Sequence, residues 1–254
     1  MLFCRKKQLK KQLIYLKENF AMVGLKGGTE VEDLTFPEIA FLKSISKNIL
    51  PLTIKIGGPE ARTDIRMCLE YGVDTVLAPM IESVYGLKNF VEAVLEMEKY
   101  YQKTIYKAIN VETVTCYHHL TDIYESPYFK EIHSVTVGRT DLAGSMQKGV
   151  DDAYTTQITK EIVSKAQALQ KNTSVGGKVT VKNLDLIRTQ INPHVINTRH
   201  VIFDLHQKKD LDKGLVEILL FEIELYKVLR KICPSKKRAY EARIADGYKR
   251  AGIN

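Results

Sequence analysis

Short apolar runs alternate with amphipathic stretches along most of the chain. The apolar runs predict seven strands, at residues 21–26, 52–56, 75–79, 106–112, 134–138, 174–179 and 199–204. Helical periodicity fills the intervals, most clearly at residues 37–48, 60–71, 84–102 and 155–170. Strands separated by helices of about 10–15 residues are typical of βαβ units, so the pattern predicts a parallel sheet.

We expect this sheet to close into a barrel rather than stay open. An open dinucleotide-binding sheet would carry a GxGxxG fingerprint after its first strand, and GLKGG at residues 24–28 lacks that spacing. Residues 8–20 read as helix, so the eighth strand is either short or absent, and irregularity is expected at the amino terminus. A length of 254 residues suits one such domain. The prediction is a single (β/α)8-type TIM barrel over residues 1–254.

Helical segments are expected at both ends, at residues 1–20 and 209–254. Within the second segment, residues 210–232 are apolar over more than one helical face, through Leu215, Ile218, Leu219, Leu220, Ile223, Leu225 and Leu229. This exceeds what a helix packed on one barrel would use. The sequence therefore predicts a helix shared with a second copy of the chain, and hence a homo-oligomer.

Composition narrows the classes of partner. Hydrophobic residues make up 44% and charged residues 27%, as in soluble globular proteins. No membrane span or secretory signal is recognisable, so a cytoplasmic protein with no membrane partner is expected. The formal net charge is +8. Its lysines are scattered and no nucleic-acid-binding signature accompanies them, so a solvated surface is favoured and no nucleic-acid partner is expected.

Polar residues at the carboxyl ends of strands are the candidates for chemistry, because parallel barrels build their active sites there. In the run AINVE, residues 108–112, alternation directs Asn110 and Glu112 into the barrel, since the apolar residues between them should face the helices. The same argument directs Lys55 inward. These three side chains are predicted to meet in the barrel mouth.

A carboxylate inside a barrel is costly unless a cation neutralises it. Asp141 closes the strand that follows Glu112, and two carboxylates completed by water and substrate oxygens make an ordinary shell for Mg²⁺ or Mn²⁺. In the alternative interpretation Glu112 pairs with Lys55 or Arg139, and Asp141 caps a helical turn. Spacing alone leaves both interpretations open.

Four motifs occur in order on consecutive strand ends: KIGGPEA (55–61), APMIES (78–83), INVET (109–113) and VGRTDLAGSM (137–146). Together they resemble the HpcH/HpaI aldolase and citrate-lyase β-subunit family, within the phosphoenolpyruvate/pyruvate barrel superfamily. The resemblance covers residues 21–205 and is most specific at Glu112 and Asp141. It implies a TIM barrel and a metal-dependent carbon–carbon lyase that acts on a 2-oxo acid through a pyruvate-type enolate.

The resemblance also assigns roles to residues. Glu112 and Asp141 match the two carboxylates that bind the divalent metal, Mg²⁺ or Mn²⁺. The turn at residues 138–141 matches the one whose backbone N–H groups receive the substrate carboxylate, and a glycine-containing turn is a natural anion nest. The implied substrate-binding residues are Asn110, Gly138, Arg139 and Thr140.

Two departures from the family pattern affect the catalytic groups. Lys55 stands in place of a barrel arginine, so it offers a single point charge where the guanidinium would offer a planar set of donors. Such a lysine could also form a Schiff base. An acid/base histidine is missing from residues 26–33, where Glu30 or Glu32 could take its role or simply be surface acids. The predicted catalytic residues are Lys55 and Glu30.

Two other functions stay open. One is an acyl-CoA lyase of the citrate-lyase type, although no nucleotide-binding element is recognisable. The other is a non-catalytic barrel that binds a carboxylate or phosphate. This alternative stays open because the acid/base histidine is missing.

Overall fold

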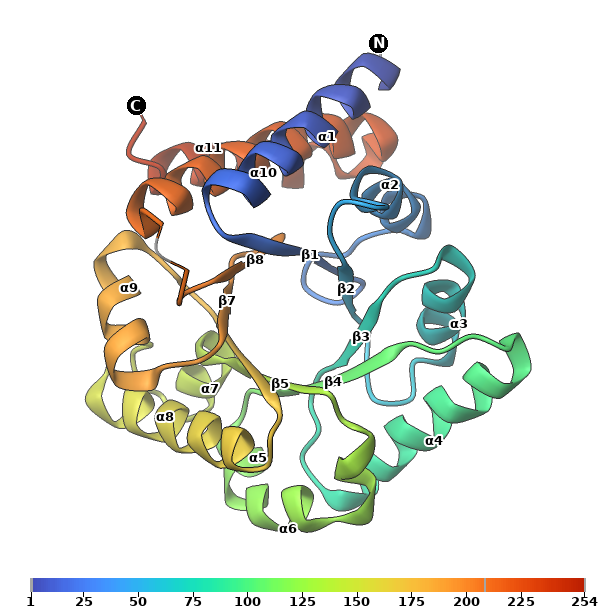
Figure 1. Ribbon diagram of the computed structural model, residues 1–254, viewed down its shortest axis with the longest axis vertical. Helices are drawn as coiled ribbons and strands as arrows, with labels where there is room; N and C mark the ends of the chain where they lie inside the picture. Colours follow the sequence, from blue (N-terminus) through green and yellow to red (C-terminus); the bar gives the residue numbers. More distant parts are fainter. Residues whose placement is uncertain (1, 208, 254) are drawn as a thin grey trace.

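The computed structural model describes residues 2–207 and 209–253, so positions 1, 208 and 254 of the predicted domain lie outside the described residues. Within these ranges eight strands close a barrel in chain order (Figure 1). The strands are β1 (Met22–Gly28), β2 (Leu52–Lys55), β3 (Thr75–Ala78), β4 (Tyr106–Val111), β5 (Ser134–Gly138), β6 (Asn172–Gly176), β7 (Val195–Asn197) and β8 (Val201–Asp204).

Helices surround the barrel (Figure 1). The longer ones are α1 (Leu2–Asn19), α2 (Phe36–Ser46), α3 (Arg62–Tyr71), α4 (Val84–Tyr101), α8 (Ala153–Ala168), α10 (Leu211–Ile232) and α11 (Lys237–Arg250). Shorter ones are α5 (Val114–His118), α6 (Leu120–Glu125), η1 (Pro127–Glu131), α7 (Arg139–Ser145), α9 (Val181–Leu186), η2 (Ile187–Ile191) and η3 (Pro234–Lys236). Several begin at side chains that accept a hydrogen bond from the first turn, as expected for N-caps: Ser83, Asp152 and Asp210.

The predicted TIM-type barrel is confirmed, with one irregularity at its closure. Neighbouring strands from β1 to β7 pair in parallel, whereas β8 runs antiparallel to both β7 and β1. Only residues 198–200 join β7 to β8, and a parallel crossover needs a dozen residues or more. The chain therefore has to turn back on itself. The pairing of β8 with β1 also contains a register shift between Met22 and Gly24.

The strand missing from the sequence prediction is β7. Its three residues, Val195–Asn197, are too few for a period-two pattern to stand out. The predicted strand at 199–204 is β8, the antiparallel strand that closes the barrel.

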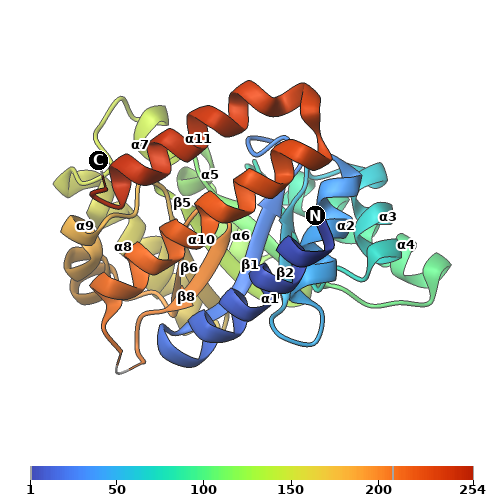
Figure 2. The same ribbon diagram turned by 90° about the horizontal axis from the view of Figure 1, so that it is seen from above.

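The apolar faces of α10 are covered by the chain's own helices. Figure 2 shows α11 running along α10, with α1 beside it over β1. Gly247 in α11 permits a close approach, since a Cβ there would lie 2.7 Å from Ile223 Cγ1. The width of the apolar surface at residues 210–232 is thus explained within one chain. It no longer argues for a subunit interface, and self-association stays a prediction.

The inner face of the barrel is unusually polar. Lys55, Asn110 and Thr136 come from β2, β4 and β5, and Thr136 shares a 2.7 Å hydrogen bond with Ser174. The outward residues are aliphatic and pack against the helices, as Ile54 and Ile109 do. In the described parts of the chain, no helix combines the length and apolar character that crossing a membrane requires.

Candidate active site

Three predicted residues meet at the carboxyl end of the barrel. Lys55 is the last residue of β2, Glu112 directly follows β4, and Glu30 lies in the loop after β1. The Lys55 ammonium is 3.0 Å from Glu112 Oε2 and 2.6 Å from Glu30 Oε2. Of the two pairings that the sequence allowed for Glu112, the one with Lys55 is found.

Glu112 is held by further donors. Its carboxylate accepts a 3.0 Å hydrogen bond from the Met80 N–H at Oε1, and one from the Asn110 amide at Oε2. Only 2% of the residue is exposed. Gly138, at the end of β5, lies against this group, because a Cβ there would be 3.0 Å from Glu112 Cβ. Asn110 and Gly138 therefore adjoin Glu112, where they were expected.

The two carboxylates keep Lys55 charged. Burial by itself would lower the pKa of the Lys55 ammonium, but Glu112 and Glu30 outweigh it and hold that pKa above its ordinary value. A lysine clamped as a cation on both sides is a poor nucleophile. The contacts thus favour Lys55 as a charge and not as the amine of a Schiff base.

Arg139 is engaged elsewhere. Its guanidinium is fully buried and donates to Asp151 Oδ1 at 3.1 Å and to the Gly177 carbonyl at 3.1 Å. The side chain ties the start of α7 to neighbouring loops, so the alternative pairing of Arg139 with Glu112 is wrong. Gly177, with φ of 93°, lets its loop lie close to the start of α7, since a Cβ at Gly177 would lie 2.6 Å from the Thr140 nitrogen. For Arg139, only the backbone is left to meet a substrate.

Asp141 is exposed in the first turn of α7, three residues beyond Gly138. No group of three or more His, Cys, Asp or Glu side chains able to hold a metal occurs among the described residues. The donors that are present are nevertheless hard oxygens. Asn110 Oδ1 is buried beside Glu112 without a hydrogen-bond partner, and an amide oxygen with two carboxylates suits Mg²⁺ or Mn²⁺. The oxygens present are thus of the kind that such an ion takes, and a metal held by Glu112 and Asp141, with water and substrate as the remaining ligands, stays a prediction.

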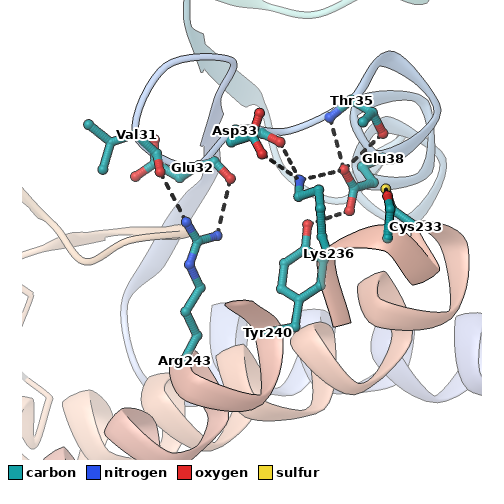
Figure 3. A network of polar contacts seen from close by, with 10 residues as sticks. Val31, Glu32, Asp33, Thr35, Glu38, Cys233, Lys236, Tyr240 and Arg243 are labelled. Carbon is teal, nitrogen blue, oxygen red and sulfur yellow. Dashed lines mark hydrogen bonds and ion pairs between the residues drawn. The ribbon is translucent and has the colours of Figure 1, made fainter. Parts of the chain in front are cut away.

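The loop that carries Glu30 is fastened by the last helix of the chain (Figure 3). Arg243 in α11 donates to the carbonyls of Glu32, at 3.1 Å, and Val31, at 3.0 Å. A second attachment centres on Glu38 in α2. Its carboxylate is 2.9 Å from the Lys236 ammonium and accepts a hydrogen bond from the Tyr240 hydroxyl. A loop so held keeps Glu30 against Lys55.

These attachments also set the charge of Glu38. Burial would raise the pKa of its carboxyl, but hydrogen bonds from Tyr240, the Thr35 backbone and Lys236 outweigh burial and bring that pKa below its ordinary value. The carboxylate form is therefore the one that docks α11. Sequence reasoning missed both attachments, because Arg243 and Val31 lie 212 positions apart.

Sequence reasoning also missed Lys26, which lies on β1 inside the barrel. A signal was available, since alternation along the predicted strand 21–26 sets Lys26 opposite the buried Leu25.

A cleft of about 400 Å³ lies at the opposite end of the barrel, where β6 and β7 begin, with Asn172 and His194 in its wall. None of the predicted site residues lines it. The chemistry-bearing side chains and this cleft are therefore separate features.

Solved structures of known proteins share this architecture. An HpcH/HpaI aldolase from Desulfitobacterium hafniense DCB-2 matches with a TM-score of 0.59 and 14% identity, over 74% of this chain and 80% of that one. The chain has the fold of the HpcH/HpaI aldolases. An HpcH/HpaI aldolase/citrate lyase family protein from Burkholderia cenocepacia J2315 matches with a TM-score of 0.56 and 14% identity, over 71% and 79% of the two chains.

The citrate synthase SbnG matches with a TM-score of 0.57 and 13% identity, over 90% of this chain and 89% of that one. No protein-family model and no curated protein sequence matches the chain. At these identities the likeness concerns the fold, so function has to be argued from the site.

Proposed function

We propose that this protein is a carbon–carbon lyase of the aldolase type, which acts on a 2-oxo acid through a pyruvate-type enolate. The observation that carries the proposal is the buried ion pair of Lys55 and Glu112, joined by Glu30, at the carboxyl end of the barrel. Likeness of fold to aldolases supports it.

Lys55 supplies a fixed positive charge where negative charge develops. When the bond next to the pyruvate unit breaks, its electrons pass into the carbonyl and leave an enolate oxygen. A preorganised cation in a site poor in water stabilises such an oxygen far better than water does. Because its pKa is raised, Lys55 is an ammonium throughout this step.

The turn at the start of α7 would receive the substrate carboxylate. Gly138 ends β5 beside Glu112, and the N–H groups of residues 139 and 140 follow it. Backbone N–H groups in such a turn favour an anion. A carboxylate bound there would place the keto oxygen toward Lys55.

Glu30 is suited to handle a proton at the edge of the site. Its Oε2 contacts Lys55 and has no other hydrogen-bond partner among the described residues. In the cleavage direction it would take the hydroxyl proton of the departing fragment, and in the condensation direction it would return it.

Glu112 and Asp141 would hold a divalent ion, which supplies Lewis-acid polarisation of the keto group when bound.

Exchange of the pyruvate methyl protons in deuterated buffer, followed by NMR, tests the proposal. Enolate formation gives exchange without the second substrate being known. The wild-type protein should catalyse exchange with Mg²⁺ or Mn²⁺, and chelator should abolish it. Pyruvate binding without any exchange would instead support a non-catalytic carboxylate-binding barrel.

A further inference from the structure

Forming the enolate from pyruvate itself, as in the condensation direction and in exchange of the methyl protons, requires a base for the carbon-bound proton, and the charged groups already described have other roles. Lys55 is held as an ammonium between two carboxylates. Glu112 accepts from Lys55, from the Met80 N–H and from Asn110. Glu30 lies 2.6 Å from Lys55 and is assigned above to the hydroxyl proton of the departing fragment. Another basic group is needed at the barrel mouth.

Lys26 lies on the inner face of β1. A Cβ at the next residue, Gly27, would meet Leu34 Cδ1 at 2.6 Å, so Gly27 faces the helix layer. A Cβ at Gly28 would lie 3.3 Å from Lys55 Cβ, so that residue faces the site. By alternation Lys26 shares the face of Gly28 and projects into the barrel. It is half-buried and so keeps access to solvent.

The Lys26 ammonium has no hydrogen bond or ion pair in the parts of the chain that the structure describes. Lysines on the inner face of a barrel more often have a counter-ion. Lys107, buried on β4, is bound instead by both carboxylate oxygens of Glu98, at 3.1 and 3.0 Å. A half-buried amine without an ion-pair partner is less well stabilised in its charged form than a paired one.

The surroundings of Lys26 also lower the pKa of its ammonium on balance. Burial lowers the pKa of its ammonium, and the cations Lys55 and Arg199 add to this, while Glu32 and Glu112 oppose it. The pKa is left below its ordinary value. On the β8 side, His200 Nδ1 is 3.0 Å from the Lys26 carbonyl, and burial lowers the pKa of this imidazole, which favours its neutral form. A neutral amine is thus more accessible at Lys26 than at Lys55.

We propose that Lys26 is the general base of the reaction, taking the proton from the methyl carbon of the bound pyruvate unit. The carbon–hydrogen bond breaks and a nitrogen–hydrogen bond forms at Nζ. The electron pair moves into the carbon–carbon double bond and leaves charge on the keto oxygen, which Lys55 faces. In the reverse direction Lys26 returns the proton. This inference rests on the proposed function, since it concerns the same enolate.

Two substitutions separate a base from a mere positive charge. Lys26→Met removes both, whereas Lys26→Arg keeps the charge but cannot act as a base, because a guanidinium stays protonated. Both variants should lose exchange of pyruvate methyl protons by on the order of 10²–10⁴-fold. Mn²⁺ affinity and the circular dichroism spectrum should be unchanged. Lys88→Met, on the surface of α4, is the matched control and should exchange like the wild type.

Rescue and pH give a second readout. Methylamine should restore exchange to Lys26→Ala, and tetramethylammonium, a cation without basicity, should not. Wild-type exchange should rise with pH through the lowered pKa of Lys26, and this limb should be absent in Lys26→Arg.

The outcomes are distinguishable. Wild-type rates in Lys26→Arg would overturn the base role while leaving the proposed function intact. A borohydride-trapped pyruvate adduct on Lys26 would also overturn it, since the amine would then act covalently. Absence of exchange in the wild type would refute the proposed function, and this inference with it.

Discussion

Replacing Lys55 by methionine should reveal how much the buried ion pair matters to stability. Glu112, 2% exposed, would lose its cation while keeping the hydrogen bonds from the Met80 N–H and Asn110. Removing one partner of a buried pair costs about 3–5 kcal/mol. The remaining donors place the expected loss of unfolding free energy near the lower end, about 3 kcal/mol at neutral pH.

The loss should depend on pH, with a definite sign. In the wild type, burial already holds the folded-state pKa of Glu112 above its ordinary value, against the opposing effect of Lys55. Loss of Lys55 raises that pKa further, which defines a pH range between the wild-type and variant pKa values. A proton on Glu112 then relieves the unpaired charge. The penalty is therefore small at acid pH, grows as pH rises through that range, and is constant above the raised pKa.

Urea unfolding at several pH values measures this penalty, from midpoints at constant slope. The matched control is the double variant Lys55→Met with Glu112→Leu, which leaves only Glu30 without its cation, on a side chain that is 32% exposed, and should recover most of the lost stability. The reasoning fails if Lys55→Met is as stable as the wild type, or if the double variant is no more stable than the single one.

Three further substitutions test the surroundings of the site. Gly138→Ala places a Cβ 3.0 Å from Glu112 Cβ, so exchange should fall about tenfold or more, as expected from a displaced site group, with unchanged helix content by circular dichroism. Arg243→Ala frees the loop of Glu30 and should lower the exchange rate at saturating pyruvate without changing Mn²⁺ affinity; an unaltered rate would contradict the positioning role. Glu38→Gln should destabilise the fold by about 1–3 kcal/mol at neutral pH, as for a lost charged hydrogen-bond partner. Because the folded-state pKa of Glu38 is lowered, that difference should be present above about pH 4.5 and vanish as pH falls further, in thermal unfolding at matched ionic strength.

Strand alternation was enough to predict the central residues of the site. Asn110 and Glu112 alternate with Ile109 and Val111, so the period of two fixed which side chains enter the barrel before any contact was known. The same logic placed Lys55 correctly. Local pattern succeeds here because both strands have helices on one face and the barrel interior on the other.

The rest of the site depends on contacts that no local pattern encodes. Arg243 reaches the carbonyls of Val31 and Glu32 from the far end of the chain. The apolar surface of α10 was interpreted as a subunit interface, because a sequence does not show which helix covers it, and α1 and α11 do. The motif also does not show that the Arg139 side chain is buried against Asp151, which leaves the backbone N–H of this residue as its predicted binding group.

A structure determined with oxalate and Mn²⁺ tests the central claim most directly, because oxalate is a planar mimic of the pyruvate enolate. The account predicts one anomalous Mn²⁺ peak bound by Glu112 and Asp141, with oxalate chelating the ion. The Lys55 ammonium should lie within hydrogen-bond distance of an oxalate oxygen, and the N–H groups of residues 139 and 140 should face its carboxylate. Oxalate bound elsewhere, or no ion at Glu112 with the Lys55–Glu112 contact unchanged, would contradict the assignment of this site.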